Sequence, residues 1–216
     1  MLKPLLFALC LLPAGWLAGA AYRDALGANP IEAITHFTGD WALRFLLLTL
    51  AVTPVRRVCA WNGVVRYRRM LGLFAFFYAS LHLATYLVLD HFFDWRAALA
   101  DVRERPYITA GATALLCLLP LALTSTRGWI RRLGRRWATL HRLAYVAALA
   151  AVVHYWWLVK ADVRTPLWYA AILALLLLVR LIHAVNARWR AAATRPQAGP
   201  LTPATRRAPS PEARSR

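Results

Sequence analysis

The sequence has few cysteines, few acidic residues and no glycine-rich phosphate loop. The cysteines are the most informative of these shortages. Its three cysteines form no CxxC or CxxCH motif, which argues against covalent c-type heme, a cysteine zinc site and a disulfide scaffold. Only nine of the 216 residues are acidic, which leaves a formal net charge of +18. No internal repeat is evident. The remaining question is where the charges lie.

Long apolar stretches make up most of the chain. Hydrophobic residues account for 60% of it and charged residues for 17%, and the charges cluster between the apolar stretches instead of mixing with them. A soluble helix or strand keeps one face polar, whereas membrane spans are nearly uniform apolar runs of about 20 residues joined by polar loops. The composition therefore predicts an all-α, polytopic membrane protein in contact with lipid.

The apolar runs predict a six-helix transmembrane bundle. The expected spans are 5–21, 42–58, 70–89, 107–124, 138–158 and 167–186. The first run ends in Ala18-Gly19-Ala20, which resembles a signal-peptidase site, so a cleaved signal peptide is an alternative. Lys3 alone would form its basic flank, and a retained helix is preferred.

The loops differ sharply in charge. Segments 56–69 and 125–136 each carry several arginines and no acid, and the tail after 187 is also basic. Apart from Glu212 in the tail, the acidic residues fall in the other loops: Asp24, Glu32, Asp40, Asp90, Asp94, Asp101, Glu104 and Asp162. Because basic loops stay in the cytoplasm, both termini are predicted to be cytoplasmic in a multi-pass protein of the bacterial inner membrane. The basic excess then reflects topology and gives no support for nucleic-acid binding.

Two regions follow from these patterns. Residues 1–190 are expected to form the six-helix domain. Residues 191–216 contain mainly Ala, Pro, Arg, Ser and Thr. Such a segment buries too little apolar surface to offset the entropy of ordering it, so a disordered basic cytoplasmic tail is predicted.

Six histidines are the main candidates for chemistry, because a polar side chain within the hydrocarbon is costly. Three lie in loops or near helix ends, where headgroups satisfy them: His36, His91 and His183. His82 and His154 lie well inside apolar runs, on the predicted third and fifth spans. At about 1.5 Å per residue, both reach the outer half of the bilayer within a turn or two of each other.

Two histidines at similar depth on separate helices are what a bis-imidazole heme requires, and such a heme transfers electrons instead of binding substrate. Small residues lie within roughly 80° of each histidine on a helical wheel and could admit a flat macrocycle: Gly72, Ala75 and Ala79 for His82, and Ala147 and Ala151 for His154. The same residues could simply pack helices, and the histidines could bond to each other across helices. The residues alone leave both readings open.

His141 lies 13 residues before His154, about 20 Å along a helix, which suits a second redox centre nearer the cytoplasm. On a straight helix, however, the two would be rotated by about 220°. The position on the third span that would nearly share the face of His82 is Arg68, and an arginine offers no lone pair to iron. Arg68 and Arg69 could instead pair with a propionate or an anionic cofactor.

Several motifs resemble one known family. They are Thr38-Gly39-Asp40-Trp41-Ala42-Leu43-Arg44-Phe45, Arg68-Arg69-Met70-Leu71-Gly72, Arg105-Pro106-Tyr107-Ile108-Thr109, Leu133-Gly134-Arg135-Arg136-Trp137, Leu140-His141-Arg142 and His154-Tyr155-Trp156. In identity, order and spacing, from about residue 5 to 190, they resemble MsrQ proteins, a branch of the ferric-reductase-like transmembrane group. MsrQ is the heme-binding membrane subunit of the bacterial periplasmic methionine-sulfoxide reductase system.

The resemblance implies a ferric-reductase-like six-helix protein carrying b-type heme, with His82, His141 and His154 as the heme-iron ligands and FMN as a further cofactor. It implies electron transfer from the quinone pool or a cytoplasmic flavin reductase to a periplasmic molybdopterin enzyme. That partner would reduce methionine sulfoxide in oxidised proteins, so catalysis would not reside in this chain. Aromatic residues near the outer interface could line the electron exit or form an interfacial belt: Trp95, Tyr155, Trp156 and Trp157.

Two other functions are weighed against this one. The chain could be a cytochrome b subunit of another dehydrogenase, or a metal reductase acting alone. It could also be a heme-free membrane transporter or assembly factor whose histidines relay protons.

Overall fold

All regular structure in the described part of the chain is helical. The computed structural model describes residues 2–159 and 162–193, with side chains to 190. The helices are α1 (Leu2–Tyr22), α2 (Pro30–Val58), η1 (Asn62–Tyr67), α3 (Arg68–Thr85), η2 (Tyr86–Asp90), α4 (Trp95–Glu104), α5 (Pro106–Leu123), α6 (Arg127–Leu133), α7 (Arg135–Leu140), α8 (Leu143–Leu158) and α9 (Arg164–Ala193). The chain divides into a unit of residues 1–180, described below, and a second unit, 181–216, whose described part is the end of α9.

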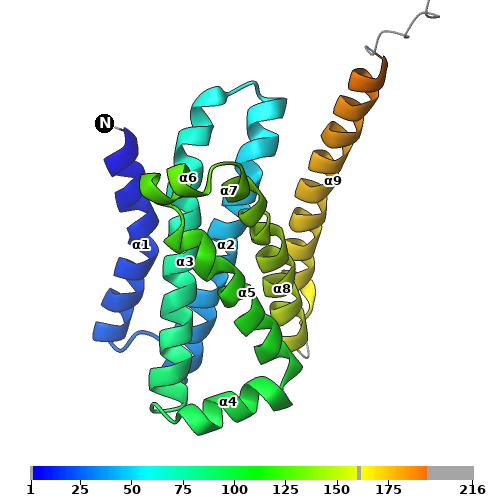
Figure 1. Ribbon diagram of the computed structural model, residues 1–216. Coiled ribbons are helices and arrows are strands. Elements are labelled where there is room, and N and C mark those ends of the chain that lie inside the picture. Colours follow the sequence, from blue (N-terminus) through cyan, green and yellow to red (C-terminus); the bar gives the residue numbers. More distant parts are fainter. Residues whose placement is uncertain (1, 160–161, 194–216) are drawn as a thin grey trace, which may run out of the picture. The chain divides into compact units, whose positions relative to one another are not determined.

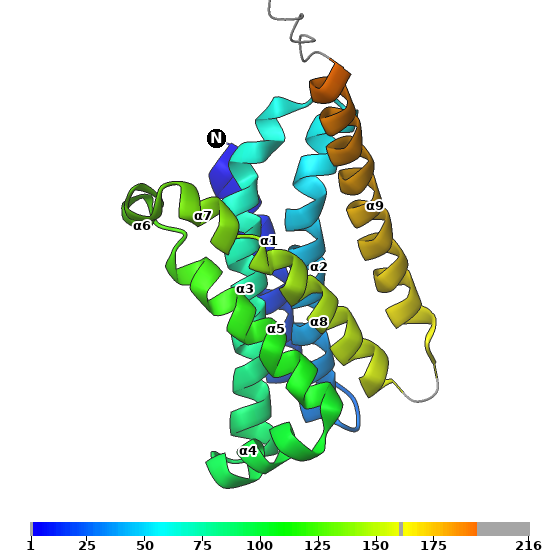
Figure 2. The ribbon, with the colours of Figure 1, turned by 45° about the vertical axis from the view of Figure 1, so that its right-hand side comes forward.

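The long helices of the first unit alternate in direction (Figures 1 and 2). α1, α3 and α8 run one way, and α2, α5 and the part of α9 up to residue 180 run the other. Short helix α4 lies across one end of the unit, while η1, α6 and α7 lie toward the end at which α1 begins. The arginine-rich segments 56–69 and 125–136 are therefore at one end, and α4 with its acidic residues is at the other.

Four helical segments of the described chain are long and apolar enough to cross a membrane. They are Leu2–Tyr22, Asn62–Asp90, Pro106–Leu123 and Arg164–Arg190. The predicted spans 42–58 and 138–158 correspond to α2 and α8, which fall short of that standard. α2 carries charges along much of its length, and α8 has only 16 residues. The all-helical prediction is confirmed, while the count of six spans stays a prediction.

α2 begins twelve residues earlier than the span predicted at 42–58. Its start is an ordinary helix N-terminus: the side chain of Asn29 accepts a hydrogen bond from the Glu32 backbone N–H, and Pro30 occupies the first turn. The polar stretch around Thr38 and Asp40 is therefore helical and not a loop. This extension matters because residues 35–40 form part of the candidate site.

The helix predicted at 138–158 is broken. α7 ends at Leu140, α8 begins at Leu143, and His141 lies in the turn between them. The rotation of about 220° between His141 and His154 would hold only on one straight helix. His141 precedes α8, so the two histidines are not related by that rotation.

The core of the first unit is built around α2 and α3. Phe45 stacks on Tyr78 and Phe74, with ring centroids 5.3 and 5.6 Å apart. The Tyr78 hydroxyl, fully buried, accepts a hydrogen bond from the Ala14 N–H (3.1 Å) and donates one to the Cys10 carbonyl (2.9 Å). α1 is thus held to α3 by a polar contact inside an apolar interface. The two backbone groups that Tyr78 contacts, at Cys10 and Ala14, flank Pro13, which has no N–H of its own.

Candidate cofactor site

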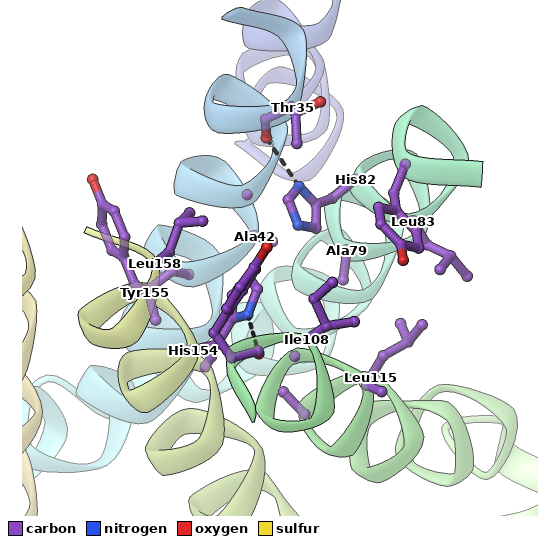
Figure 3. A pocket seen from close by; sticks show the side chains of 18 of the residues that line it. Thr35, Ala42, Ala79, His82, Leu83, Ile108, Leu115, His154, Tyr155 and Leu158 are labelled. Carbon is purple, nitrogen blue, oxygen red and sulfur yellow. Dashed lines mark hydrogen bonds between the residues drawn. The ribbon is translucent and has the colours of Figure 1, made fainter. Parts of the chain in front are cut away.

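An apolar cavity of about 300 Å³ lies between α2, α3, α5 and α8. Its walls are mainly alanine, leucine and glycine, including Ala42, Leu43, Leu46, Ala79, Gly111, Ala114, Leu115, Leu118 and Ala151. Two imidazoles, those of His82 and His154, project into it from α3 and α8 (Figure 3). The volume is at the lower end of the range for small-molecule and cofactor sites, which are likewise largely apolar with a few placed polar groups.

His82 is fixed by a helix backbone. Its Nδ1 lies 2.9 Å from the carbonyl oxygen of Thr35 on α2. Because a carbonyl can only accept, Nδ1 must carry the proton, and the lone pair of the neutral ring is then on Nε2. The imidazole also lies against Gly39, one turn further along α2.

His154 is fixed in the same way by α5. Its Nδ1 lies 2.6 Å from the carbonyl oxygen of Tyr107, which again places the proton on Nδ1 and the lone pair on Nε2. The ring packs against Gly111, one turn beyond Tyr107. Metal-ligating histidines typically donate their other N–H to such an acceptor, which fixes both the tautomer and the ring orientation.

The two rings face each other at a spacing that suits one iron between them. Their centroids are 6.0 Å apart, and their planes make an angle of 77°. With about 2.0 Å per metal–nitrogen bond and about 1.1 Å from nitrogen to ring centre, two imidazoles on opposite sides of one iron have centroids roughly 6 Å apart. Among the described residues no group of three or more His, Cys, Asp or Glu side chains could hold a bare metal ion. Two imidazoles are the donors that a heme, which supplies its other four nitrogens itself, would take from the protein.

The small residues near the histidines divide between two roles. Ala79 and Ala151 line the cavity beside the rings. Ala75 and Ala147 are fully buried away from it, and Gly72 faces Thr49 of α2. Only part of the predicted small-residue stripe therefore borders the cavity, and the rest brings helices into close contact, as small residues do in membranes.

α4 and its flanks form the polar rim of the cavity. Asp101 accepts a hydrogen bond from the Tyr86 hydroxyl (3.3 Å) and pairs with Arg105 (3.2 Å) and His91 (3.4 Å). Arg105 lines the cavity and also donates to the Tyr107 hydroxyl, a bond that raises the pKa of its guanidinium. The rim thus contains a permanent positive charge held by a network of neighbours.

The other histidines are not grouped with this pair. His141 stacks on Trp137 at 3.8 Å between centroids, and its Nδ1 lies 3.1 Å from the Trp137 carbonyl. Burial lowers the pKa of His141, the hydrogen bond to the Trp137 carbonyl opposes this, and the charge of Arg68 lowers the pKa further. His36, expected in a loop, is on α2 and lines the cavity rim. His91 belongs to the Asp101 network, and His183 is in the second unit.

Of the aromatic residues predicted near an electron exit, Tyr155 alone lines the cavity. Trp95, Trp156 and Trp157 are exposed, at 58%, 38% and 55%, as an interfacial belt would be. Sequence reasoning missed the glycines and carbonyls that hold the histidines. A helical glycine beside a ligand leaves no distinctive sequence pattern. One of the two glycines, Gly39, and one of the two carbonyl residues, Tyr107, nevertheless lie in motifs shared with the MsrQ family.

The fold and the site define a class: an all-helical, multi-pass membrane protein with two imidazoles facing each other across an apolar interhelical cavity. The family model described as "Ferric reductase like transmembrane component" matches residues 38–152, over half of the chain. The match includes His82 and His141 and ends two residues before His154.

Closely similar relatives carry one name, protein-methionine-sulfoxide reductase heme-binding subunit MsrQ. The relative from Herminiimonas arsenicoxydans is 53% identical over 191 residues, covering 87% of this chain and 88% of its own. That from Rhodospirillum rubrum is 56% identical over 183 residues, covering 84% and 88%. That from Xanthomonas euvesicatoria is 53% identical over 188 residues, covering 87% and 86%. The chain belongs to the MsrQ family, as its motifs predicted. No solved structure matches it.

Proposed function

We propose that this chain is a membrane electron-transfer subunit that binds b-type heme between His82 and His154. The observation that carries the proposal is the facing pair of imidazoles, 6.0 Å apart in an apolar cavity, each with Nδ1 on a carbonyl. The name that its relatives share, a heme-binding subunit, supports it. Bound heme would supply a reversible one-electron couple at iron.

The residues of this chain would hold and insulate that group. His82 and His154 would ligate through Nε2, since Nδ1 is occupied on both rings. Leucine and alanine side chains from four helices would exclude water from the macrocycle. Arg105, charged and at the rim, has the charge that a propionate needs. A heme held by two histidines would transfer electrons and would not bind substrate, which suits a carrier.

Electrons would enter at the end with the arginine-rich segments, which we propose is cytoplasmic. The proposed donor is the quinone pool or a cytoplasmic flavin reductase. His141 is at that end, stacked on Trp137 with Nδ1 near the Trp137 carbonyl, and we propose it as a further heme ligand. We also propose that FMN binds at this end. Arg180 donates hydrogen bonds to the Tyr145 hydroxyl and the Leu50 carbonyl, and Arg68 is nearby. The two positive charges would suit an anionic cofactor.

Electrons would leave at the opposite end, which carries α4. The proposed acceptor is a periplasmic molybdopterin enzyme that reduces methionine sulfoxide in oxidised proteins. Asp90, Asp94 and Glu104 lie at this end among arginines of α4 and its flanks, and we propose that these carboxylates contact basic residues of the partner. Both chain ends would then be cytoplasmic.

The spectrum of the purified protein tests the heme proposal. Wild type should show a Soret band and, on reduction, a low-spin b-type spectrum. His82→Ala and His154→Ala should each abolish most of it. His141→Ala should keep that low-spin signal, because His141 is outside the cavity, and any fall in heme per chain would measure heme at the other end. Full heme retention in both His82→Ala and His154→Ala would refute the ligand assignment.

The donor and the partner need separate measurements. In vesicles, a quinol analogue or a flavin reductase with NADH should reduce the heme, and whichever fails is not the donor. Co-purification with a periplasmic molybdoenzyme supports the proposed partner, whereas co-purification with another dehydrogenase favours a different cytochrome b role. A colourless protein after expression with ample heme would favour a transporter.

A further inference from the structure

The two candidate ligands are held by one arrangement that occurs twice. In each case a histidine donates from Nδ1 to the carbonyl of a residue 47 positions earlier, Thr35 for His82 and Tyr107 for His154. In each case the ring lies against a glycine four positions after that carbonyl residue, Gly39 or Gly111. Residues four apart stack on one face of a helix, so the glycine and the carbonyl form one surface.

The correspondence extends along the cavity wall. Several cavity-lining residues of α2 and α3 are followed 72 positions later by an identical residue in α5 or α8, as Gly39 is by Gly111 and His82 by His154. At the same spacing the cavity is lined by Ala42 and Ala114, Leu43 and Leu115, Leu46 and Leu118, and Ala79 and Ala151. The prediction that the chain holds no internal repeat is therefore wrong for these wall positions. The repeat escapes notice because its identical residues are common ones spread over two helices.

A side chain at either glycine would crowd the imidazole beside it, more severely at Gly111 than at Gly39. A Cβ on Gly39 would lie 3.1 Å from His82 Nδ1 and 3.2 Å from its Cε1, closer than side chains normally approach. A Cβ on Gly111 would lie 2.8 Å from His154 Nδ1 and 3.0 Å from its Cε1, so something must move. The obstructing atoms belong to rigid rings that are hydrogen-bonded to the same helix, so the rings cannot yield without loosening those bonds.

We propose that Gly39 and Gly111 are positioning residues, which let each imidazole lie against its neighbouring helix so that the carbonyl four residues earlier orients Nε2 toward the iron. The proposal rests on the proposed heme function. It adds that ligand orientation is set by α2 and α5, and not by the helices that carry the histidines. Substitution of Gly111 should disturb its histidine more than substitution of Gly39, because the added Cβ would lie closer to the imidazole.

Alanine substitutions in the heme-loaded protein test this. Gly111→Ala should weaken heme retention by about 10-fold or more, as the loss of an outer-shell partner does. In the fraction that keeps heme, the low-spin ferric EPR signal should shift, because its g-anisotropy depends on the angle between the axial ring planes, here 77°. The midpoint potential should move with it. Gly39→Ala should give the same changes at smaller size.

Two glycines of the same chain serve as matched controls. Gly72 is on α3, the helix of His82, where a Cβ would meet Thr49 at an ordinary 3.5 Å, and Gly15 on α1 has nothing within 4 Å. Their alanine variants should match wild type in heme content, EPR and potential. The positioning role is wrong if Gly39→Ala and Gly111→Ala match these controls. That outcome differs from failure of the heme proposal itself, in which His82→Ala and His154→Ala retain heme.

Discussion

The Tyr78 hydroxyl makes the packing of α1 directly testable. It is fully buried, accepts from the Ala14 N–H at 3.1 Å and donates to the Cys10 carbonyl at 2.9 Å. Cys10 and Ala14 are four residues apart, so their polar groups would ordinarily bond to each other in the helix. Tyr78→Phe removes the hydroxyl and keeps the ring that stacks on Phe45.

The expected cost follows from these contacts. An ordinary hydrogen bond contributes about 0.5–1.5 kcal/mol net, and measured bonds between membrane helices average about 0.6 kcal/mol. Two such bonds give roughly 1–3 kcal/mol on the first value and about 1.2 kcal/mol on the second. In the variant, however, the Ala14 N–H and the Cys10 carbonyl can bond to each other, so neither group is left unsatisfied. We therefore expect about 1 kcal/mol, the lower end of that range.

Reversible unfolding in mixed micelles measures this difference. Tyr22→Phe is the matched control, because Tyr22 is on the same helix that Tyr78 contacts and is 93% exposed. Heme content should be unchanged in both variants, because neither tyrosine lines the cavity. If Tyr78→Phe unfolds at the same denaturant concentration as Tyr22→Phe, the hydroxyl does not hold α1 to α3.

Two further predictions concern the ends of the first unit. Asp101→Asn removes the charge that Tyr86, His91 and Arg105 contact, so α4 should be destabilised by roughly 1 kcal/mol. The backbone amides of α4 should then exchange hydrogen faster, and unchanged exchange would mean that the network does not hold α4. Cys59 is exposed in an arginine-rich segment, so a membrane-impermeant maleimide should label it in inside-out vesicles and not in spheroplasts, with Cys59→Ser as control. The reverse labelling would invert the proposed topology.

The sequence predicted helix positions well where a helix is an uninterrupted apolar run. The run at 107–124 became α5 at Pro106–Leu123, and the first run became α1 with Pro13 inside it. Hydrophobic burial and backbone hydrogen bonding act locally in such segments, so composition is enough. The MsrQ motifs then predicted the family, which the relatives confirm.

What the sequence could not predict depends on backbone groups and on contacts between helices. The early start of α2 was missed because Thr38 and Asp40 look like loop residues, although Asn29-Pro30 is a helix start. The carbonyls of Thr35 and Tyr107 have no side-chain signature at all, since every residue carries a carbonyl. Their role emerges only when α3 and α8 place a histidine against them.

α2 and α8, which do not meet the length and hydropathy criteria for a membrane span, are both packed against other helices. This packing is relevant to whether they cross the membrane. α2 supplies much of the buried core, from Leu43 to Val52, and Ala147 and Ala148 of α8 are fully buried.

Hydropathy criteria assume that a helix faces lipid, but a covered helix can carry polar groups when its neighbours satisfy them. Arg44 of α2 pairs with Asp40 and donates to the Tyr169 hydroxyl. α8 falls short by length and not by composition, since it has 16 residues and none of them is Asp, Glu, Lys or Arg. α1 and α3 run in the same direction, as do α5 and the part of α9 up to residue 180. The chain must return between the members of each pair, so we infer that α2 and α8 also cross.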